Sequence, residues 1–309
     1  MIGAHKKGTL MVLLSAIFFG LLPFFAIKTY AEGFDINNLL LYRYSFAFVL
    51  IGLFCVYKKI SVRINKKQLL LLLMAAFVGT MMTTYTLFLS YKYISSGLAS
   101  TLHFVYPIIT LVLAGIIYKE KLTPKKIIAL ILSFLGIAML SVGSGLTINL
   151  TGVLWALVSG FFYALYILSL ANAELKKISP FVVVFWVFGI TALLFFGKCL
   201  FADGIITSLS GKALFYILNL SFWSTFLAAV LFYLGMKYIG PGNASLLSTL
   251  EPLTGVMVGA FVFNEVLDLK SILAISLILT SVLIVVQGSK KPKYRMFFHK
   301  ITSQRLKRV

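Results

Sequence analysis

Three ionisable side chains lie inside long apolar stretches of the chain, where a charged group is costly and usually functional. They are Arg43, His103 and Glu251. A buried histidine or carboxyl group can take up and release a proton, whereas a guanidinium or a carboxylate can pair with a charged solute. The first chemistry that these residues suggest is therefore the binding of protons or of a small charged solute.

Each of the three also has a structural interpretation. Glu251 could pair inside the protein with a serine, a tyrosine or an arginine, and His103 could be a neutral histidine that bonds across two helices. Arg43 would lie roughly 10 Å from the outer edge of its helix at 1.5 Å per residue, so its long side chain could also extend outward to the membrane surface. The residue types alone leave these alternatives open.

Two prolines occupy equivalent places in two apolar stretches, at Pro107 and Pro252. Because a proline cannot donate a hydrogen bond to the carbonyl four residues earlier, the carbonyl groups of His103 and Ser248 should be released. Backbone groups released at membrane depth are tolerated where they are buried or line a wet cavity. We therefore expect these helix-breaking prolines to mark the two helices that line a solute site.

Aromatic and hydroxyl side chains could complete such a site. A single aromatic ring is more often ordinary helix packing or an anchor at the membrane interface, and that alternative stays open. The further candidates for solute binding or coupling are Tyr85, Tyr106, Trp155, Tyr163 and Ser248.

The elements that carry these residues come from a duplication. The stretch 92–132 returns at 237–277 without a gap, at a shift of 145 positions and with 14 of 41 residues identical. Many of the matched residues are polar, small or helix-breaking, so shared hydrophobicity does not explain the match. We divide the chain into a first five-helix repeat at 1–145, a second at 146–288, and a basic tail at 289–309.

Composition places the chain in a membrane, because 61% of its residues are hydrophobic and 12% are charged. Soluble domains have about 45–50% and about 25%, respectively. A spanning helix needs about 20 mostly apolar residues. The sequence predicts an all-α integral membrane protein with ten transmembrane helices, at about 9–28, 36–57, 68–90, 97–118, 125–143, 152–173, 180–201, 212–235, 243–263 and 270–287.

The basic residues predict the orientation. With the N-terminus inside, 22 Lys and Arg residues fall on the inner side of the membrane and 5 on the outer side. This bias predicts that both termini are cytoplasmic. Since each half has an odd number of helices, the second half should enter from the opposite side, as in the inverted repeats of many secondary transporters.

These features together resemble the EamA family of the drug/metabolite transporter superfamily. The resemblance rests on the arginine near the start of helix two, on the openings ASTLHFVYP and ASLLSTLEP, and on the helix ends KEKLTPKK and NEVLDLKS. It implies a carrier of the cytoplasmic membrane, often an exporter of amino acids or other metabolites. It also implies a central cavity lined by helices one, three, four, six, eight and nine. No arginine or other charged residue corresponds to Arg43 in the second half, where Trp186 and Val187 occupy the region.

Other function classes have less support. No GxxxxGKS motif for ATP-driven pumping and no HExxH or CxxC motif for a metal or hydrolytic centre occurs in the sequence. A pore would be expected to show charged rings or a carbonyl filter. We therefore expect a secondary transporter that works by alternating access, is not an enzyme, and uses no cofactor and no metal. Its expected partners are a small-molecule substrate and the lipid bilayer, not nucleic acid, and it could be a monomer or a homodimer. Import rather than export, and less readily an enzyme or a pore, stay open.

Overall fold

The computed structural model describes residues 2–94, 96–120, 122–141, 149–201, 204–262 and 269–288. Every regular element within these ranges is helical. The predicted basic tail at 289–309 lies outside the described residues, as does Glu265, the repeat counterpart of Glu120.

The predicted apolar stretches fold into single helices or into consecutive helical segments. In the first half these are α1 (Ile2–Gly20), α2 (Leu22–Ala31), α3 (Ile36–Tyr57), α4 (Lys66–Met74), the π-helical η1 (Ala75–Met81), α5 (Met82–Ser90), α6 (Ser96–His103), α7 (Tyr106–Tyr118) and α8 (Pro124–Ser141). In the second half they are α9 (Leu150–Leu170), α10 (Ala173–Lys176), α11 (Pro180–Phe201), α12 (Gly211–Ser221), the π-helical η2 (Phe222–Leu227), α13 (Ala228–Ile239), α14 (Pro241–Leu247), α15 (Leu250–Val262) and α16 (Leu269–Gly288).

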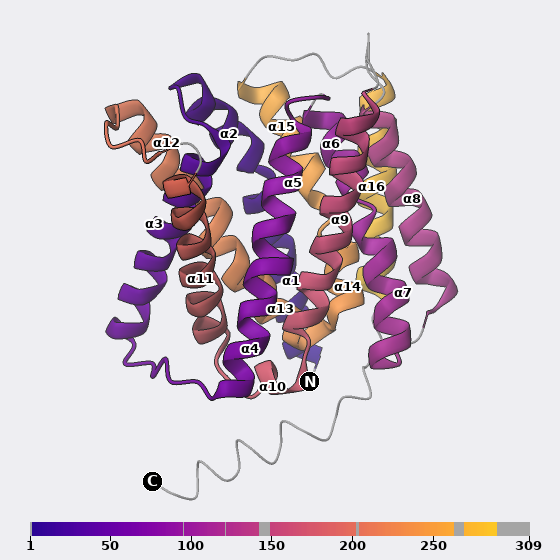
Figure 1. The fold of residues 1–309 in the computed structure, drawn as a ribbon. Coiled ribbons are helices and arrows are strands. Elements are labelled where there is room, and N and C mark those ends of the chain that lie inside the picture. Colours follow the sequence, from indigo (N-terminus) through magenta and orange to yellow (C-terminus); the bar gives the residue numbers. More distant parts are fainter. Residues whose placement is uncertain are drawn as a thin grey trace, which may run out of the picture.

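Six helical stretches in the described part of the chain are long and apolar enough to cross a membrane, and two further apolar helices are shorter. The long ones are 5–31, 36–57, 66–90, 150–170, 180–201 and 211–239. The chain is thus an all-helical, multi-pass membrane protein, and its helices run side by side as a bundle (Figure 1).

Helices pack in pairs that reflect the duplication. α1 lies against α13 and α9 lies against α5, so the first helix of each half contacts the third helix of the other. Both contacts depend on a glycine: a Cβ atom on Gly8 would meet Tyr238, and one on Gly152 would meet Tyr93, which is the repeat counterpart of Tyr238. α3 packs on its own counterpart α11, and α8 packs on its counterpart α16.

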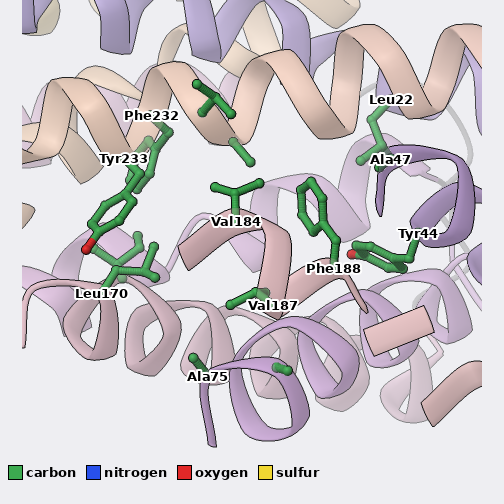
Figure 2. Close-up of a cluster of buried hydrophobic side chains, with 14 of the residues drawn as sticks. Leu22, Tyr44, Ala47, Ala75, Leu170, Val184, Val187, Phe188, Phe232 and Tyr233 are labelled. Atoms are coloured by element: carbon green, nitrogen blue, oxygen red, sulfur yellow. The ribbon is translucent and has the colours of Figure 1, made fainter. Parts of the chain in front are cut away.

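The middle of the bundle is filled by large apolar side chains around α11. Figure 2 shows Tyr44 and Phe188 side by side, with their ring centroids 5.7 Å apart. Both rings are almost inaccessible, with 2% of each residue exposed. This packing joins α3 to α11 and forms one wall of the interior in which the polar residues lie.

The two ends of the bundle differ in their polar contacts. α4 and α10 lie at one end, near the start of α1 (Figure 1), where the side chain of Lys177 donates to Glu174 at 2.7 Å. This hydrogen bond is the main reason that the pKa of Glu174 lies below its usual value. At the other end, Asn38 donates to the carbonyl oxygen of Gly204 at 3.0 Å and ties the start of α3 to the loop before α12.

Candidate functional site

Two helices are interrupted at repeat-equivalent places. α6 ends at His103 and α7 starts at Tyr106, just before Pro107. In the second half, α14 ends at Leu247 and α15 starts at Leu250, just before Pro252. Pro107 is the second residue of α7 and Pro252 is the third of α15, where a proline has no hydrogen bond to give to the preceding turn. The Ser248 carbonyl oxygen is nevertheless not released as predicted, because it accepts from the Glu251 N–H at 3.0 Å. The interruptions thus place His103 and Ser248, which precede each proline by four residues, inside the bundle, with 5% and 3% of each residue exposed.

His103 is joined to α9 by its side chain and by its backbone. Its Nδ1 atom lies 2.8 Å from the Ser159 hydroxyl, which itself donates to the carbonyl oxygen of Ala156 at 2.6 Å. Since the single Ser159 proton is used in that second bond, Nδ1 is assigned as the donor, and Nε2 is then the acceptor of a neutral ring. The His103 carbonyl oxygen lies so close to Gly160 that a Cβ atom there would approach it to 2.5 Å.

Tyrosine rings surround His103. The ring centroid of Tyr106 lies 5.3 Å from that of His103, and the Tyr163 ring lies 5.4 Å from it. Tyr106 and Tyr163 also meet edge to face, at 4.6 Å. The Tyr106 hydroxyl lies near Ser248, but within the described residues it is a buried oxygen without a hydrogen-bond partner. Glu251 lies within electrostatic range of both tyrosines, so this cluster joins residues from both halves.

Arg43 is buried, with 3% of the residue exposed. It therefore does not extend outward to the membrane surface. Its Nε atom donates to the Thr225 hydroxyl at 2.7 Å, and Nη2 lies 3.4 Å from the carbonyl oxygen of Ser224. Nη1 is buried and has no partner among the described residues. Glu251 lies within electrostatic range of Arg43, but the ion pairs of the described chain do not include this pair.

A small, partly open cavity of about 60 Å³ lies beside Arg43. It is lined by Phe19, Arg43, Tyr44, Thr80, Thr83, Thr84, Tyr163, Tyr166, Phe188, Thr225 and Ala229. These residues come from α1, α3, η1, α5, α9, α11, η2 and α13. Two of the predicted site residues, Arg43 and Tyr163, thus share one cavity. The interrupted helices α6–α7 and α14–α15, which the prolines led us to expect in the lining, contribute none of the described residues that line it.

A larger, partly open cavity of about 540 Å³ lies among α2, α3 and α5. Its lining includes Tyr30, Asp35, Tyr91 and Lys92. Tyr30 and Tyr91 lie within electrostatic range of Arg43, which lines the smaller cavity. α2 stands at the end of the bundle opposite α4 and α10 (Figure 1), which is the end that the distribution of basic residues predicts to be outside.

The other end is held by Glu120. Its carboxylate forms an ion pair with Lys126 at 3.3 Å. A Cβ atom on Gly240 would lie 2.7 Å from Oε1 of Glu120, and one on Gly242 would lie 2.6 Å from Oε2. The carboxylate therefore lies against the first turn of α14, where the positive end of the helix dipole favours it. This contact joins the end of α7 to the start of α14.

The remaining predicted residues lie elsewhere. The Nζ atom of Lys198 lies 3.0 Å from the centre of the Tyr85 ring, so that ring meets α11. Trp155 is half-buried and precedes Ser159 by one helical turn on α9.

Sequence reasoning missed Ser159, Thr83 and Thr225. A signal for Thr225 existed, because it follows Thr80 by the same 145 positions as the main repeat.

Known proteins match the chain over most of its length. The profile of the EamA-like transporter family matches residues 6–142 and 150–287. An uncharacterized transporter of Archaeoglobus fulgidus is 27% identical over 286 residues, covering 90% of this chain and 96% of the relative. The uncharacterized inner membrane transporter YicL of Salmonella typhimurium is 25% identical over 301 residues, covering 94% and 98%. A crystal structure of a protein with 14% sequence identity has the same fold, with a TM-score of 0.79 over 92% of this chain and 98% of that one.

Proposed function

Because the chain belongs to the EamA-like transporter family, and is therefore a membrane transporter rather than an enzyme, we propose that it exports a small organic metabolite, such as an amino acid, by alternating access. In this proposal it is a secondary transporter with ten transmembrane helices arranged as two inverted five-helix repeats. It lies in the cytoplasmic membrane with both termini in the cytoplasm, as a monomer or a homodimer.

The observation that carries the proposal is the pair of interrupted helices. α6–α7 and α14–α15 break within one residue of counterpart positions, and His103, Tyr106 and Ser248 beside the breaks are buried, while Glu251 is half-buried. Interrupted helices at the interface of two repeats are where secondary transporters bind their solutes. The asymmetry of the two ends fits alternating access, since a cavity reaches in from one end while Glu120 joins α7 to α14 at the other.

Each residue near the breaks has a role in this proposal. Glu251 and His103 couple transport to protons or contact the solute, because each can change charge inside the membrane. Arg43, Tyr106, Tyr163 and Ser248 contact the solute, whereas Tyr85 and Trp155 belong to the surrounding wall. Pro107 and Pro252 keep the two helices interrupted, so that the segments on either side can tilt separately.

Counterflow in reconstituted vesicles tests the transport proposal. Purified protein would be placed in liposomes loaded with pooled amino acids and metabolites, and entry of each labelled solute against its own excess inside would be measured. A carrier saturates and shows counterflow, whereas a pore does neither. Flux that rises linearly with concentration and shows no counterflow would rule out the carrier.

Cysteine labelling in intact cells tests the orientation. Engineered cysteines at Glu32 and Asp203 should react with an impermeant reagent added outside, and one at Lys293 should not. Asp203 and Lys293 lie outside the described residues, so labelling would determine on which side of the membrane these two positions lie. Outside labelling at Lys293 would contradict the inverted arrangement.

A further inference from the structure

We infer that the cavity beside Arg43 binds the carboxylate of an organic anion whose remaining part is apolar. This inference rests on the proposed transport function and narrows its solute to one chemical class. It depends on the unpaired donors of the cavity and on the division of its lining between polar and apolar side chains.

The first observation is the unpaired nitrogen of Arg43. A guanidinium is always charged and carries five N–H donors in a fixed plane. Nε and Nη2 of Arg43 bond to Thr225 and to the Ser224 carbonyl, and Nη1 has no partner in the described part of the chain. A buried cationic donor without a partner is unfavourable unless an anion completes it. A carboxylate from a solute would accept from Nη1 and offset the charge.

The second observation is a nearby hydroxyl with an unused proton. Thr80 and Thr84 also line the cavity, but their hydroxyls donate to carbonyl oxygens of their own helix, at 3.3 Å and 2.9 Å. The hydroxyl of Thr83 is buried and has no partner among the described residues. A carboxylate has two oxygen atoms and can accept from a guanidinium and a hydroxyl together.

The third observation concerns the repeat counterparts of the polar lining residues. The residue 145 positions after Arg43 is Phe188, and the residue 145 positions after Thr84 is Ala229. The residue 144 positions before Tyr163 is Phe19. All three counterparts line the same cavity. In these three pairs one residue is polar and its counterpart is less polar or apolar, whereas Thr80 and its counterpart Thr225 are both polar. The lining thus has a polar part and an apolar part, which suits a solute with a charged end and an apolar end.

The charge of the site selects against cations. Glu251 is within electrostatic range of Arg43, but it forms no ion pair with Arg43 in the described residues. A cationic solute placed in the cavity would meet the unpaired side of the guanidinium at short range. A neutral solute would leave the charge of Arg43 unbalanced. An anion is the class of solute that satisfies this group.

Binding to the purified full-length protein, with matched probes, tests the inference. Acetate, butyrate and phenylacetate would be compared with acetamide, butyramide and phenylacetamide and with the corresponding amines, by titration and by thermal shift. We expect each carboxylate that the space of about 60 Å³ admits to bind more tightly than its amide and its amine. Each amide should bind at least about tenfold more weakly than its acid, because a charge-assisted hydrogen bond is lost.

Variants separate the site from the general charge of the protein. Arg43→Gln should remove the preference for acid over amide, whereas Arg63→Gln, in an exposed loop, should leave it unchanged. Thr83→Val leaves Arg43 in place and replaces the threonine with a side chain of the same size. It therefore tests the site if Arg43→Gln does not fold. It should weaken carboxylate binding by about fivefold.

Three results would overturn the inference: amides that bind as tightly as acids, a carboxylate preference that survives in Arg43→Gln, or carboxylates that do not bind at all. Counterflow distinguishes this failure from failure of the transport proposal. If a neutral or cationic solute shows counterflow but no carboxylate binds, the transport proposal stands and the carboxylate site is wrong. If carboxylates bind in a way that depends on Arg43 but no solute shows counterflow, the carboxylate site stands and the transport proposal is wrong.

Discussion

Thr80 and Thr225 stand at counterpart positions in the two halves, and each hydroxyl donates to the carbonyl oxygen five residues earlier in its own helix. Both lie in the π-helical segments η1 and η2. A π-helical turn contains an extra residue, is rare, and often occurs at functional sites. Here both turns bring a threonine to the cavity beside Arg43, but only Thr225 also accepts a hydrogen bond from Arg43.

This difference gives the first prediction. Thr225→Val should lower the free energy of unfolding by about 1–3 kcal/mol, because it leaves Nε of Arg43 buried without its acceptor. Thr80→Val is the matched control, and it should cost less because it unpairs no charged group. Thermal unfolding of the two purified variants in the same detergent provides the comparison. Equal losses would show that the bond between Thr225 and Arg43 contributes little.

Glu251→Gln should keep the fold but lose transport or uncouple it from protons. The amide preserves the shape and the hydrogen-bonding capacity of the side chain, and it removes the ability to change charge. Counterflow and proton-driven flux across mildly acidic and mildly alkaline pH would measure the effect, with Glu32→Gln in the loop between α2 and α3 as the control. If the variant keeps the parent rates and the parent pH profile, Glu251 has no part in the mechanism and His103 becomes the candidate for coupling.

Pro107→Ala and Pro252→Ala should each reduce transport more than they reduce insertion into the membrane. Alanine can donate the hydrogen bond that proline lacks, so the interrupted helix should become more continuous and stiffer. Pro124→Ala, at the first position of α8, is the control, because no hydrogen bond is expected there. If both variants transport at the parent rate, the interruptions at Pro107 and Pro252 are not needed for transport.

Gly242→Ala should weaken the contact between α7 and α14. Its Cβ atom would lie 2.6 Å from a carboxylate oxygen of Glu120, which must then move away. Alanine otherwise favours a helix by about 1 kcal/mol over glycine. Gly197→Ala, on α11 with nothing within 4 Å of its Cβ position, should show only that stabilising effect.

The measurement is the reactivity of a cysteine placed at Leu111, beside Gly242, toward a reagent added from the side of the membrane that the Glu120 end of the bundle faces. We expect faster labelling in the Gly242→Ala background and an unchanged rate in the Gly197→Ala background. The same rate in both would mean that the Glu120 contact does not hold this end closed.

Much of the fold was predictable because it depends on local chemistry. The apolar stretches fixed the helices to within a few residues, as at 36–57 and 180–201, and the repeat placed counterpart segments in both halves. The positions of the interruptions could also be anticipated, since a proline acts on the four residues before it.

The contacts between helices were not predictable in the same way. A helix that faces lipid on one side and other apolar helices on the other is apolar all round, so its periodicity does not show which side points inward. Tyr85 and Tyr163 therefore looked alike in the sequence, yet the first ring meets Lys198 and the second lies beside His103. The bond from Arg43 to Thr225 spans 182 positions, and no local pattern indicates it.

Arg43 and its repeat counterpart Phe188 line the same cavity, and this bears on why the two halves are joined in one polypeptide. If two identical copies of the first half formed this bundle, each would bring its own guanidinium to the same space of about 60 Å³, and the two like charges would repel each other at short range. In a single chain the second position can hold a phenyl ring instead. Covalent fusion thus permits a single charge at a place where a symmetric dimer would have to carry two or none.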